Sequence, residues 1–430
     1  MNKQIVRECP LFWGDCQKLI NVQVKTLRHF FAAVAFLMIL SAGDAMTCTS
    51  AIVSGKHTRD GRPLMWKHRD TSVMESKLVY LKGEKYDIIA LVNSSSTDAR
   101  SIWIGFNSAG FAIMNTLSYN IEDDSTSSGA RNGILMREAL EHCANLDDFE
   151  MFLRDQERPM RVRANFGVID AHGGAAYYET NNDTWVKIDV NDPSIAPHGY
   201  VVRTNYSYTG TPHGGAGYIR FNTAENLFYK ASGGNNLSVD YLLEHMSLSL
   251  ENSYTGQHIN QFMHLSERDN HFIYFQDCIN RYTSTSSVVV QGIKGDESPL
   301  FTTMWTMIGF PLASVPVPVW INPQRLLPEV LTAPWGEDSP MSDYSLRLKS
   351  RMIPSERGST KYYINTTRVF NAEGSGITQR LLPVHKSLVR EAVNNLDDWR
   401  RDGMIDPGRL SALYLWADSL VRKSFEEILD

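Results

Sequence analysis

The chain between Cys48 and about Asn322 consists mainly of short runs in which apolar residues alternate with polar ones or are β-branched. Runs of this kind, about four to eight residues long and bounded by turn-forming residues, are typical of β-strands. Turn sequences such as Asp60-Gly61-Arg62-Pro63 and Ser108-Ala109-Gly110 separate several of them. The pattern predicts strands at residues 49–54, 64–67, 78–81, 88–92, 101–105, 111–115, 165–170, 175–179, 200–204, 272–275, 287–291, 301–308 and 313–320.

Apolar residues at helical spacing interrupt these strands and dominate the C-terminal part of the chain. They predict helices at residues 133–145, 147–154 and 238–250. Beyond Pro323 two longer amphipathic stretches, 381–397 and 409–429, are separated by a break at residues 403–408 that contains Pro407. This order of elements predicts an α+β layered fold over residues 48–322, followed by a C-terminal helical extension, residues 323–430, packed on it.

The N-terminal part has the pattern of a secretory signal peptide. Lys25 and Arg28 precede an unbroken apolar run from Phe30 to Leu40, and small residues follow up to Ala45. The run is shorter than the ~20 residues that a membrane span needs, although a buried core helix is an alternative. We therefore expect residues 1–47 to be a signal peptide and leader that is removed. The protein would then be exported, periplasmic or extracellular, and would meet a membrane only during export.

Composition narrows the classes of protein that remain. The chain of 430 residues is 43% hydrophobic, which is enough to build a substantial core and excludes a disordered protein. Its formal charge of −6 and the lack of a dense Lys/Arg run argue against nucleic-acid binding. The 5 cysteines are too few for a disulfide scaffold or zinc module, and the 12 histidines show no ligand spacing. We expect no metal and no cofactor.

Candidate chemistry centres on Cys48, which lies almost at the predicted processing point. The sequence contains no HExxH, Walker or GxSxG motif, and the glycine-rich stretch 212–217 is interpreted as a flexible turn. A cysteine at position one carries its own base, because a free α-amine has a pKa of ~8 and lies within reach of the thiol. Such a site needs a carboxylate to hold the amine, a cation near the sulfur and donors for the oxyanion. An ordinary buried cysteine is the alternative.

The residues around Cys48 also resemble a known family. Cys48-Thr49-Ser50 begins a strand, Asp60-Gly61-Arg62-Pro63 makes a turn, and Lys67-His68-Arg69-Asp70 ends the returning strand. This resembles the opening of N-terminal-nucleophile cysteine hydrolases, especially the penicillin acyltransferase-like cysteine peptidases, which are related to bile-salt hydrolases and penicillin V acylases. The resemblance implies a four-layer αββα sandwich with antiparallel inner sheets.

The same resemblance assigns roles to individual residues. It implies that Asp70 orients the amine, and it places Lys67 where the family has arginine, so Arg69 is a competing candidate for the cation. Asn205 matches an asparagine whose amide completes the oxyanion hole, and Asn115 matches an asparagine on the oxyanion or substrate side. Arg281 matches a late arginine near the nucleophile.

The predicted activity is that of an exported cysteine amidohydrolase. Cys48 would attack a linear amide bond of a small N-acyl amide or a peptide, and an acyl-enzyme would pass to water. Two alternatives remain: an acyltransferase that passes the acyl group to an amine, and a non-catalytic binding protein that keeps the fold. Since the predicted signal-peptide cut follows Ala45, the chemistry also requires removal of Met46 and Thr47, for which we expect autocatalysis.

Overall fold

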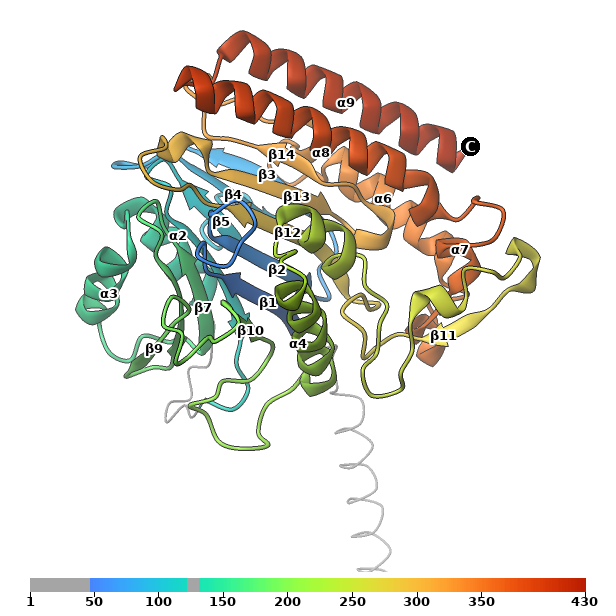
Figure 1. Cartoon of the computed structure of the whole chain (residues 1–430), viewed down its shortest axis with the longest axis horizontal. Helices are drawn as coiled ribbons and strands as arrows, with labels where there is room; N and C mark the ends of the chain where they lie inside the picture. The colour runs from blue at the N-terminus through green and yellow to red at the C-terminus, as the bar shows by residue number, and fades with distance from the viewer. Residues whose placement is uncertain (1–46, 122–130) are drawn as a thin grey trace, which may run out of the picture. The chain divides into compact units, whose positions relative to one another are not determined.

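Two antiparallel β-sheets packed face to face form the centre of the molecule (Figure 1). The computed structural model describes residues 47–121 and 131–430, so the predicted signal peptide and leader, residues 1–47, lies outside the described residues except for Thr47. The main contacts between the two sheets join β1 (Thr47–Val53) and β2 (Leu64–Asp70) of one sheet to β6 (Ala112–Leu117), β7 (Ala164–Ile169) and β8 (Ala175–Thr180) of the other. The predicted α+β sandwich is confirmed.

The first sheet contains the strand that carries Cys48. Each pair of neighbouring strands runs antiparallel, and β1 lies between β10 and β2. In spatial order the strands are β10 (Tyr200–Arg203), β1 (Thr47–Val53), β2 (Leu64–Asp70), β12 (Ser284–Gln291), β13 (Thr303–Ile308) and β14 (Val317–Val319).

The second sheet is a meander in which spatial order follows chain order. Its strands are β3 (Ser76–Leu81), β4 (Ile88–Asn93), β5 (Ile104–Asn107), β6 (Ala112–Leu117), β7 (Ala164–Ile169), β8 (Ala175–Thr180) and β9 (Trp185–Asp189). A separate two-stranded sheet pairs β11 (Phe272–Tyr274) with β15 (Tyr363–Asn365). The sequence pattern did not predict β9 or β15, because β9 is largely unburied and β15 is only three residues long.

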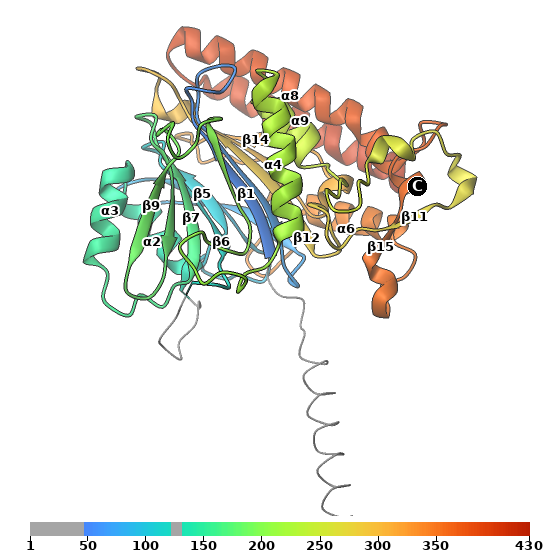
Figure 2. The ribbon, with the colours of Figure 1, turned by 60° about the horizontal axis from the view of Figure 1, so that its bottom comes forward.

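Helices cover the outer faces of both sheets and complete the four layers. Helices α2 (Asn132–His142) and α3 (Leu146–Asp155) pack on the second sheet. Helix α4 (Tyr218–Gly233) packs along β10 and β1 of the first sheet, as Figure 2 shows. The C-terminal residues form α6 (Pro340–Met352), α7 (Thr366–Val369), α8 (Ile377–Asp402) and α9 (Pro407–Leu429), and side chains of α8 and α9 share a buried core with the first sheet.

One predicted helix is wrong, and the sequence pattern predicted none of the helices α4, α6 and α7. The helix predicted at residues 238–250 is wrong, since the chain forms only α5 (Val239–Tyr241) and a π-helical turn, Leu242–Met246. Helix α4 was not predicted, because its buried face begins with the polar residues Arg220 and Thr223, which hide the apolar stripe.

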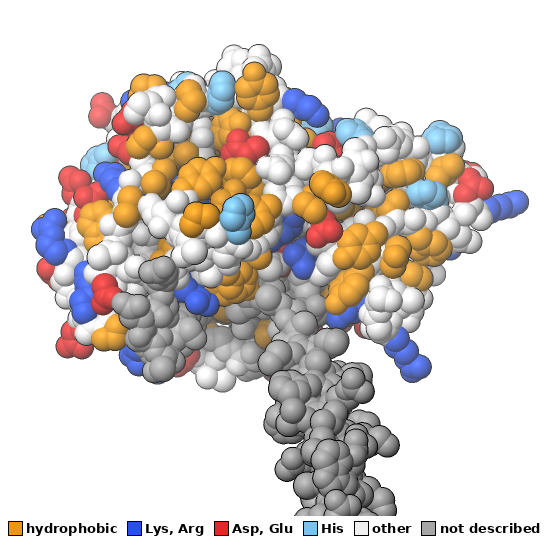
Figure 3. Space-filling view, turned by 90° about the horizontal axis from the view of Figure 1, so that it is seen from below, with side chains coloured by type: hydrophobic (Ala, Val, Ile, Leu, Met, Phe, Trp, Pro, Cys, Tyr) orange, Lys and Arg blue, Asp and Glu red, His pale blue; other side chains and the backbone are white. Residues whose placement is uncertain are grey.

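The surface mixes charged and apolar groups. Hydrophobic side chains lie in several groups between charged ones on the face seen in Figure 3. Exposed large side chains include Tyr208, Tyr254 and Trp335. Among residues 47–121 and 131–430, no helix combines the length and apolar composition that crossing a membrane requires.

Candidate active site

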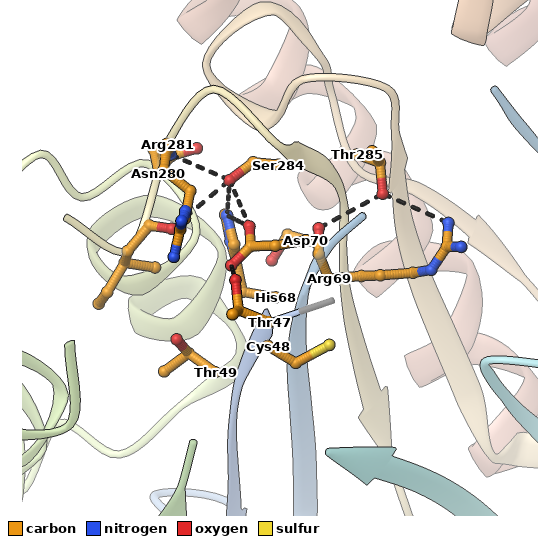
Figure 4. Close-up of polar contacts among 12 residues, drawn as sticks. Thr47, Cys48, Thr49, His68, Arg69, Asp70, Asn280, Arg281, Ser284 and Thr285 are labelled. Carbon is orange, nitrogen blue, oxygen red and sulfur yellow. Dashed lines mark hydrogen bonds and ion pairs between the residues drawn. The ribbon is translucent and has the colours of Figure 1, made fainter. Parts of the chain in front are cut away.

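The pairing of β1 with β2 decides which residues can surround each atom of Cys48. Cys48 lies opposite Arg69, and Ser50 lies opposite Lys67. Since directly opposite residues project to the same side of a sheet and alternate residues share a face, Lys67 and Arg69 lie on the thiol side. Asp70 lies opposite Thr47 and so projects to the other side. Figure 4 shows the sulfur turned toward the side on which Arg69 lies.

The backbone of Cys48 is held by two side chains from distant parts of the chain. Its N–H donates to Asn205 Oδ1 at 3.0 Å, and its carbonyl oxygen accepts from Arg220 Nη1 at 2.7 Å. Cys48 is only 6% exposed. Asn205 therefore holds the nitrogen that would become the α-amine, and its own side-chain N–H donates to Leu117 O at 2.9 Å.

Arg220 is a site residue that the sequence interpretation missed. Besides the carbonyl of Cys48, it donates to Thr49 Oγ1 at 2.7 Å and to Asn205 Oδ1 at 2.9 Å. It is buried, and this burial lowers the pKa of its guanidinium to about 10. The missed helix α4 carries Arg220, so no predicted element pointed to it.

Arg220 reaches Cys48 because the chain enters α4 through a glycine. Gly217 has a φ of +85°, and a Cβ at this position would lie 2.4 Å from Arg220 Nη2. Residues 212–217, interpreted from the sequence as a flexible turn, include a turn in the structure, and Ala216 N donates to Asn205 O at 3.2 Å, which attaches the end of this segment to the site. The sequence signal that could have pointed to Arg220 was the glycine at position 217, three residues before the arginine at the start of a helix.

Asp70 lies in a buried polar cluster on the nitrogen side of Cys48 (Figure 4). Ser284 Oγ donates to Asp70 Oδ1 at 2.7 Å, and Thr47 Oγ1 donates to Oδ2 at 3.4 Å. Burial raises the pKa of Asp70, an effect opposed by the positive charges of Arg281 and Arg220. The carboxylate thus lies beside the residue that precedes Cys48, where an amine released at Cys48 would form.

His68 completes this cluster without carrying charge. Its Nε2 lies 2.9 Å from Ser284 Oγ, and burial lowers the pKa of His68 to about 3. The ring is therefore neutral near pH 7 and forms a hydrogen bond with the hydroxyl group of Ser284.

Lys67 lies on the thiol side in a buried pocket of acceptors. Its Nζ donates to Trp103 O at 2.6 Å and to Asn115 Oδ1 at 2.9 Å. Burial lowers the pKa of Lys67 to about 8, whereas interaction with Cys48 raises it. Lys67 and Asn115, two of the predicted site residues, are in direct contact.

Arg69 is also buried on the thiol side, but its guanidinium is bound by side chains of β3, β4 and β12. It donates to Ser76 at 3.1 Å, to Thr285 at 3.3 Å and to Asn93 at 2.7 Å. Its guanidinium carbon lies 4.4 Å from the centre of the Trp103 ring. Burial lowers the pKa of Arg69 to about 10, and interaction with Cys48 raises it. Both candidate cations therefore lie close enough to Cys48 for its charge to affect their pKa values.

Arg281 lies with Asp70 and Arg220, on the other side of the strand from Lys67. Its backbone N–H donates to Ser284 Oγ at 3.0 Å, and its charge lowers the pKa of Asp70. The predicted residues thus form two groups, one at the nitrogen and one at the thiol of Cys48.

The other cysteines of the described chain are buried and unpaired. Burial raises the pKa of Cys143 and of Cys278 to about 12, so both thiols are protonated near pH 7. Within residues 47–121 and 131–430, no cluster of three or more His, Cys, Asp or Glu side chains could hold a metal ion.

Comparison with known proteins gives the chain a family. The model of the acyl-coenzyme A:6-aminopenicillanic acid acyl-transferase family matches residues 57–287, which is more than half of the chain and begins after Cys48. No curated protein matches.

Solved structures similar to the chain include an N-acylethanolamine-hydrolyzing acid amidase ortholog from Caenorhabditis elegans, with 13% identity and a TM-score of 0.37 over 59% of this chain and 93% of that one. A variant of conjugated bile acid hydrolase from Clostridium perfringens has 10% identity and a TM-score of 0.35 over 65% and 93% of the two chains. Penicillin V acylase from Agrobacterium tumefaciens has 13% identity and a TM-score of 0.33 over 65% and 87%. On the family match, the chain belongs to the acyl-coenzyme A:6-aminopenicillanic acid acyl-transferase family of N-terminal-nucleophile hydrolases, as the resemblance in its sequence predicted.

Proposed function

We propose that the protein is an exported cysteine amidohydrolase that cleaves a linear amide bond through an acyl-enzyme on Cys48. The observation that carries this proposal is the division of the site around Cys48. Its nitrogen is bound by Asn205 close to a buried carboxylate, Asp70, while two buried cations, Lys67 and Arg69, lie on the side of its thiol. A nucleophile that supplies its own base needs this separation, because the amine and the thiol require opposite charges nearby.

The reaction follows from these positions. The free α-amine of Cys48 takes the thiol proton, and the thiolate attacks the carbonyl carbon of the substrate amide. The amine then gives the proton to the leaving nitrogen, the C–N bond breaks and a thioester forms. Water attacks the thioester, with the same amine as base, and releases the acid.

The surrounding residues support individual steps. Lys67 stabilises the thiolate and also holds Asn115, whose side-chain amide is a candidate donor to the oxyanion. Asp70 and Asn205 orient the amine, and Arg220 fixes the backbone of Cys48 through its carbonyl. The charge of Arg281 opposes the effect of burial, which raises the pKa of the Asp70 carboxyl group.

Maturation is part of the proposal. Cys48 can act only as residue one, so signal-peptide removal must be followed by loss of Met46 and Thr47, for which autocatalysis is our proposal. Thr47 Oγ1 donates to Asp70 in the uncut chain, which places the bond to be broken beside the carboxylate.

Acyl transfer is the second candidate, and the family match favours it. Here an amine replaces water as the acceptor of the acyl group. Product analysis with and without added amines separates the two outcomes, since a transferase yields the new amide at the expense of the acid.

The test combines mass and activity. Intact-mass analysis of the secreted protein should find Cys48 as the first residue. A panel of N-acyl amides, including bile-acid conjugates, N-acyl amino acids, penicillin V and dipeptides, should give at least one substrate. Cys48→Ser should remain folded but lose turnover on it, because a hydroxyl is a far weaker nucleophile at neutral pH.

Two results would overturn the proposal. Active protein that retains Thr47 excludes the amine as base, and wild-type turnover by Cys48→Ser excludes the nucleophile. Secreted protein that retains Thr47 and has no activity would indicate a binding protein with this fold.

A further inference from the structure

A cavity lies at the edge of the sandwich, between β9, β10 and α4. Its volume is about 380 Å³. The polar groups among its lining residues include Arg203 of β10, Glu225 of α4 and His198, whereas Ile188, Ile195 and Phe221 form apolar walls. Such a mixture of apolar walls and a few convergent polar groups is typical of a small-molecule site.

This cavity is separate from the Cys48 site. Lys67, Arg69, Tyr119 and Arg220 have pKa values that the charge of Cys48 affects, and none of these four residues lines the cavity. Arg203 lies opposite Ser50 in β10, and β1 separates β10 from β2, the strand that carries Lys67 and Arg69.

Arg203 is the main polar feature of the cavity. It is 1% exposed, its Nε donates to Glu179 Oε1 at 2.8 Å, and its Nη1 donates to Val202 O at 2.8 Å. The Tyr208 ring covers the guanidinium, with 4.2 Å between the ring centre and Cζ. Nη2 has no hydrogen-bond partner among the described residues. A buried charged donor without a partner is costly, and a carboxylate is its strongest acceptor.

Glu225 requires a positively charged partner, whereas Arg203 requires a negatively charged one. Tyr200 donates a hydrogen bond to its carboxyl group at 3.2 Å. Burial raises the pKa of Glu225, while Arg203 and His198 lower it. A cationic ligand group beside Glu225 would compensate for this partial burial.

The charges then decide which ligand fits. A simple carboxylate would bring a third anion close to Glu179 and Glu225, and a simple amine would leave Arg203 Nη2 unsatisfied. A zwitterion satisfies both groups, and an apolar side chain would lie against Ile188, Ile195 and Phe221. We propose that this cavity binds a free α-amino acid with an apolar side chain, its carboxylate on Arg203 and its ammonium on Glu225.

The test uses the folded Cys48→Ser protein, so that its result does not depend on the proposed catalytic activity. Calorimetric titration with L-phenylalanine should show saturable binding with one site per chain. Both 3-phenylpropionate, which lacks the ammonium, and phenethylamine, which lacks the carboxylate, should bind at least about tenfold more weakly.

Variants of the cavity provide the second measurement. Glu225→Gln should weaken phenylalanine binding about tenfold but should not weaken 3-phenylpropionate binding, because that ligand has no ammonium group and is relieved of one nearby negative charge. Glu244→Gln removes a carboxylate that does not line the cavity and should change neither affinity. Thermal unfolding without ligand verifies that each variant is folded. No binding of phenylalanine at about 10 mM, equal binding of 3-phenylpropionate, or an unchanged affinity in Glu225→Gln would overturn the proposal.

Discussion

The substitution Gly217→Ala tests how the site holds Cys48 without altering any residue that contacts it. At a φ of +85° an added Cβ would lie 2.4 Å from Arg220 Nη2 and 3.1 Å from Thr204 Cβ. The guanidinium is the far end of a flexible side chain and can move away. Moving away, however, breaks its bonds to the carbonyl of Cys48, to Thr49 and to Asn205.

The expected cost has two parts. A left-handed backbone costs an alanine about 1–2 kcal/mol. Each charge-assisted hydrogen bond contributes about 1.5–3 kcal/mol, and a displaced guanidinium keeps some of this by finding other acceptors. We therefore expect a loss of about 3 kcal/mol from the bonds and about 4–5 kcal/mol in total.

A matched control separates the two parts. Gly403, which follows α8, has a φ of +76° and nothing within 4 Å of an added Cβ. Gly403→Ala should therefore lose only the backbone cost in urea unfolding. On the best substrate of the N-acyl amide panel, Gly217→Ala should reduce kcat/KM about 100-fold, which corresponds to about 2.7 kcal/mol of transition-state stabilisation, and Gly403→Ala should not. Equal losses of stability in the two variants together with equal activity would refute the role of Arg220.

The two cations and the C-terminal extension give further predictions. Lys67→Met should slow alkylation of Cys48 by iodoacetamide at pH 7 about tenfold, because the variant lacks a positive charge beside the thiolate. If Arg69→Met slows the alkylation more than Lys67→Met does, Arg69 is the principal cation instead. Lys349 of α6 donates to Tyr282 O at 2.5 Å, and burial lowers its pKa to about 7 from an ordinary 10.5. The unfolded chain binds the proton of the Lys349 ammonium group more tightly than the folded chain does. The free energy of unfolding should therefore rise between pH 7 and about pH 10.5. Urea titrations at several pH values should show this rise in the wild type and not in Lys349→Met. An identical pH dependence in the variant would contradict that assignment.

Local patterns were sufficient to predict the first hairpin. The strands β1 and β2 are neighbours in the chain, and the loop that joins them contains the turn sequence Asp60-Gly61-Arg62-Pro63, so their antiparallel pairing follows from nearby residues. For that reason the sequence could place Lys67 and Asp70 relative to Cys48. Arg220 could not be found in this way, since it lies 172 residues from Cys48 and contacts it only through tertiary packing.

The cavity that Arg203 and Glu225 line could not be predicted from local sequence patterns either. β9 carries mostly half-buried residues, so its alternation is too weak to identify a strand, yet this strand forms one wall of the cavity. Arg203 was visible in the sequence only as the residue before Thr204 and Asn205. Its burial between two tyrosine rings depends on strands that are adjacent in space and distant in the chain.

Lys67 and Asp70 are three residues apart on β2, and this spacing decides on which side of Cys48 each charge lies. From the sequence, both side chains could approach one sulfur only if the strand bulged, because residues three apart lie on opposite faces. In the structure β2 pairs without interruption from Leu64 to Asp70, and the irregularity lies in β12, between Ser284 and Ser286. The two charges are therefore kept on opposite sides of Cys48, the ammonium at the thiol and the carboxylate at the nitrogen. A spacing of two or four residues would place both on one face, where they would neutralise each other and leave one of the two atoms without its charge.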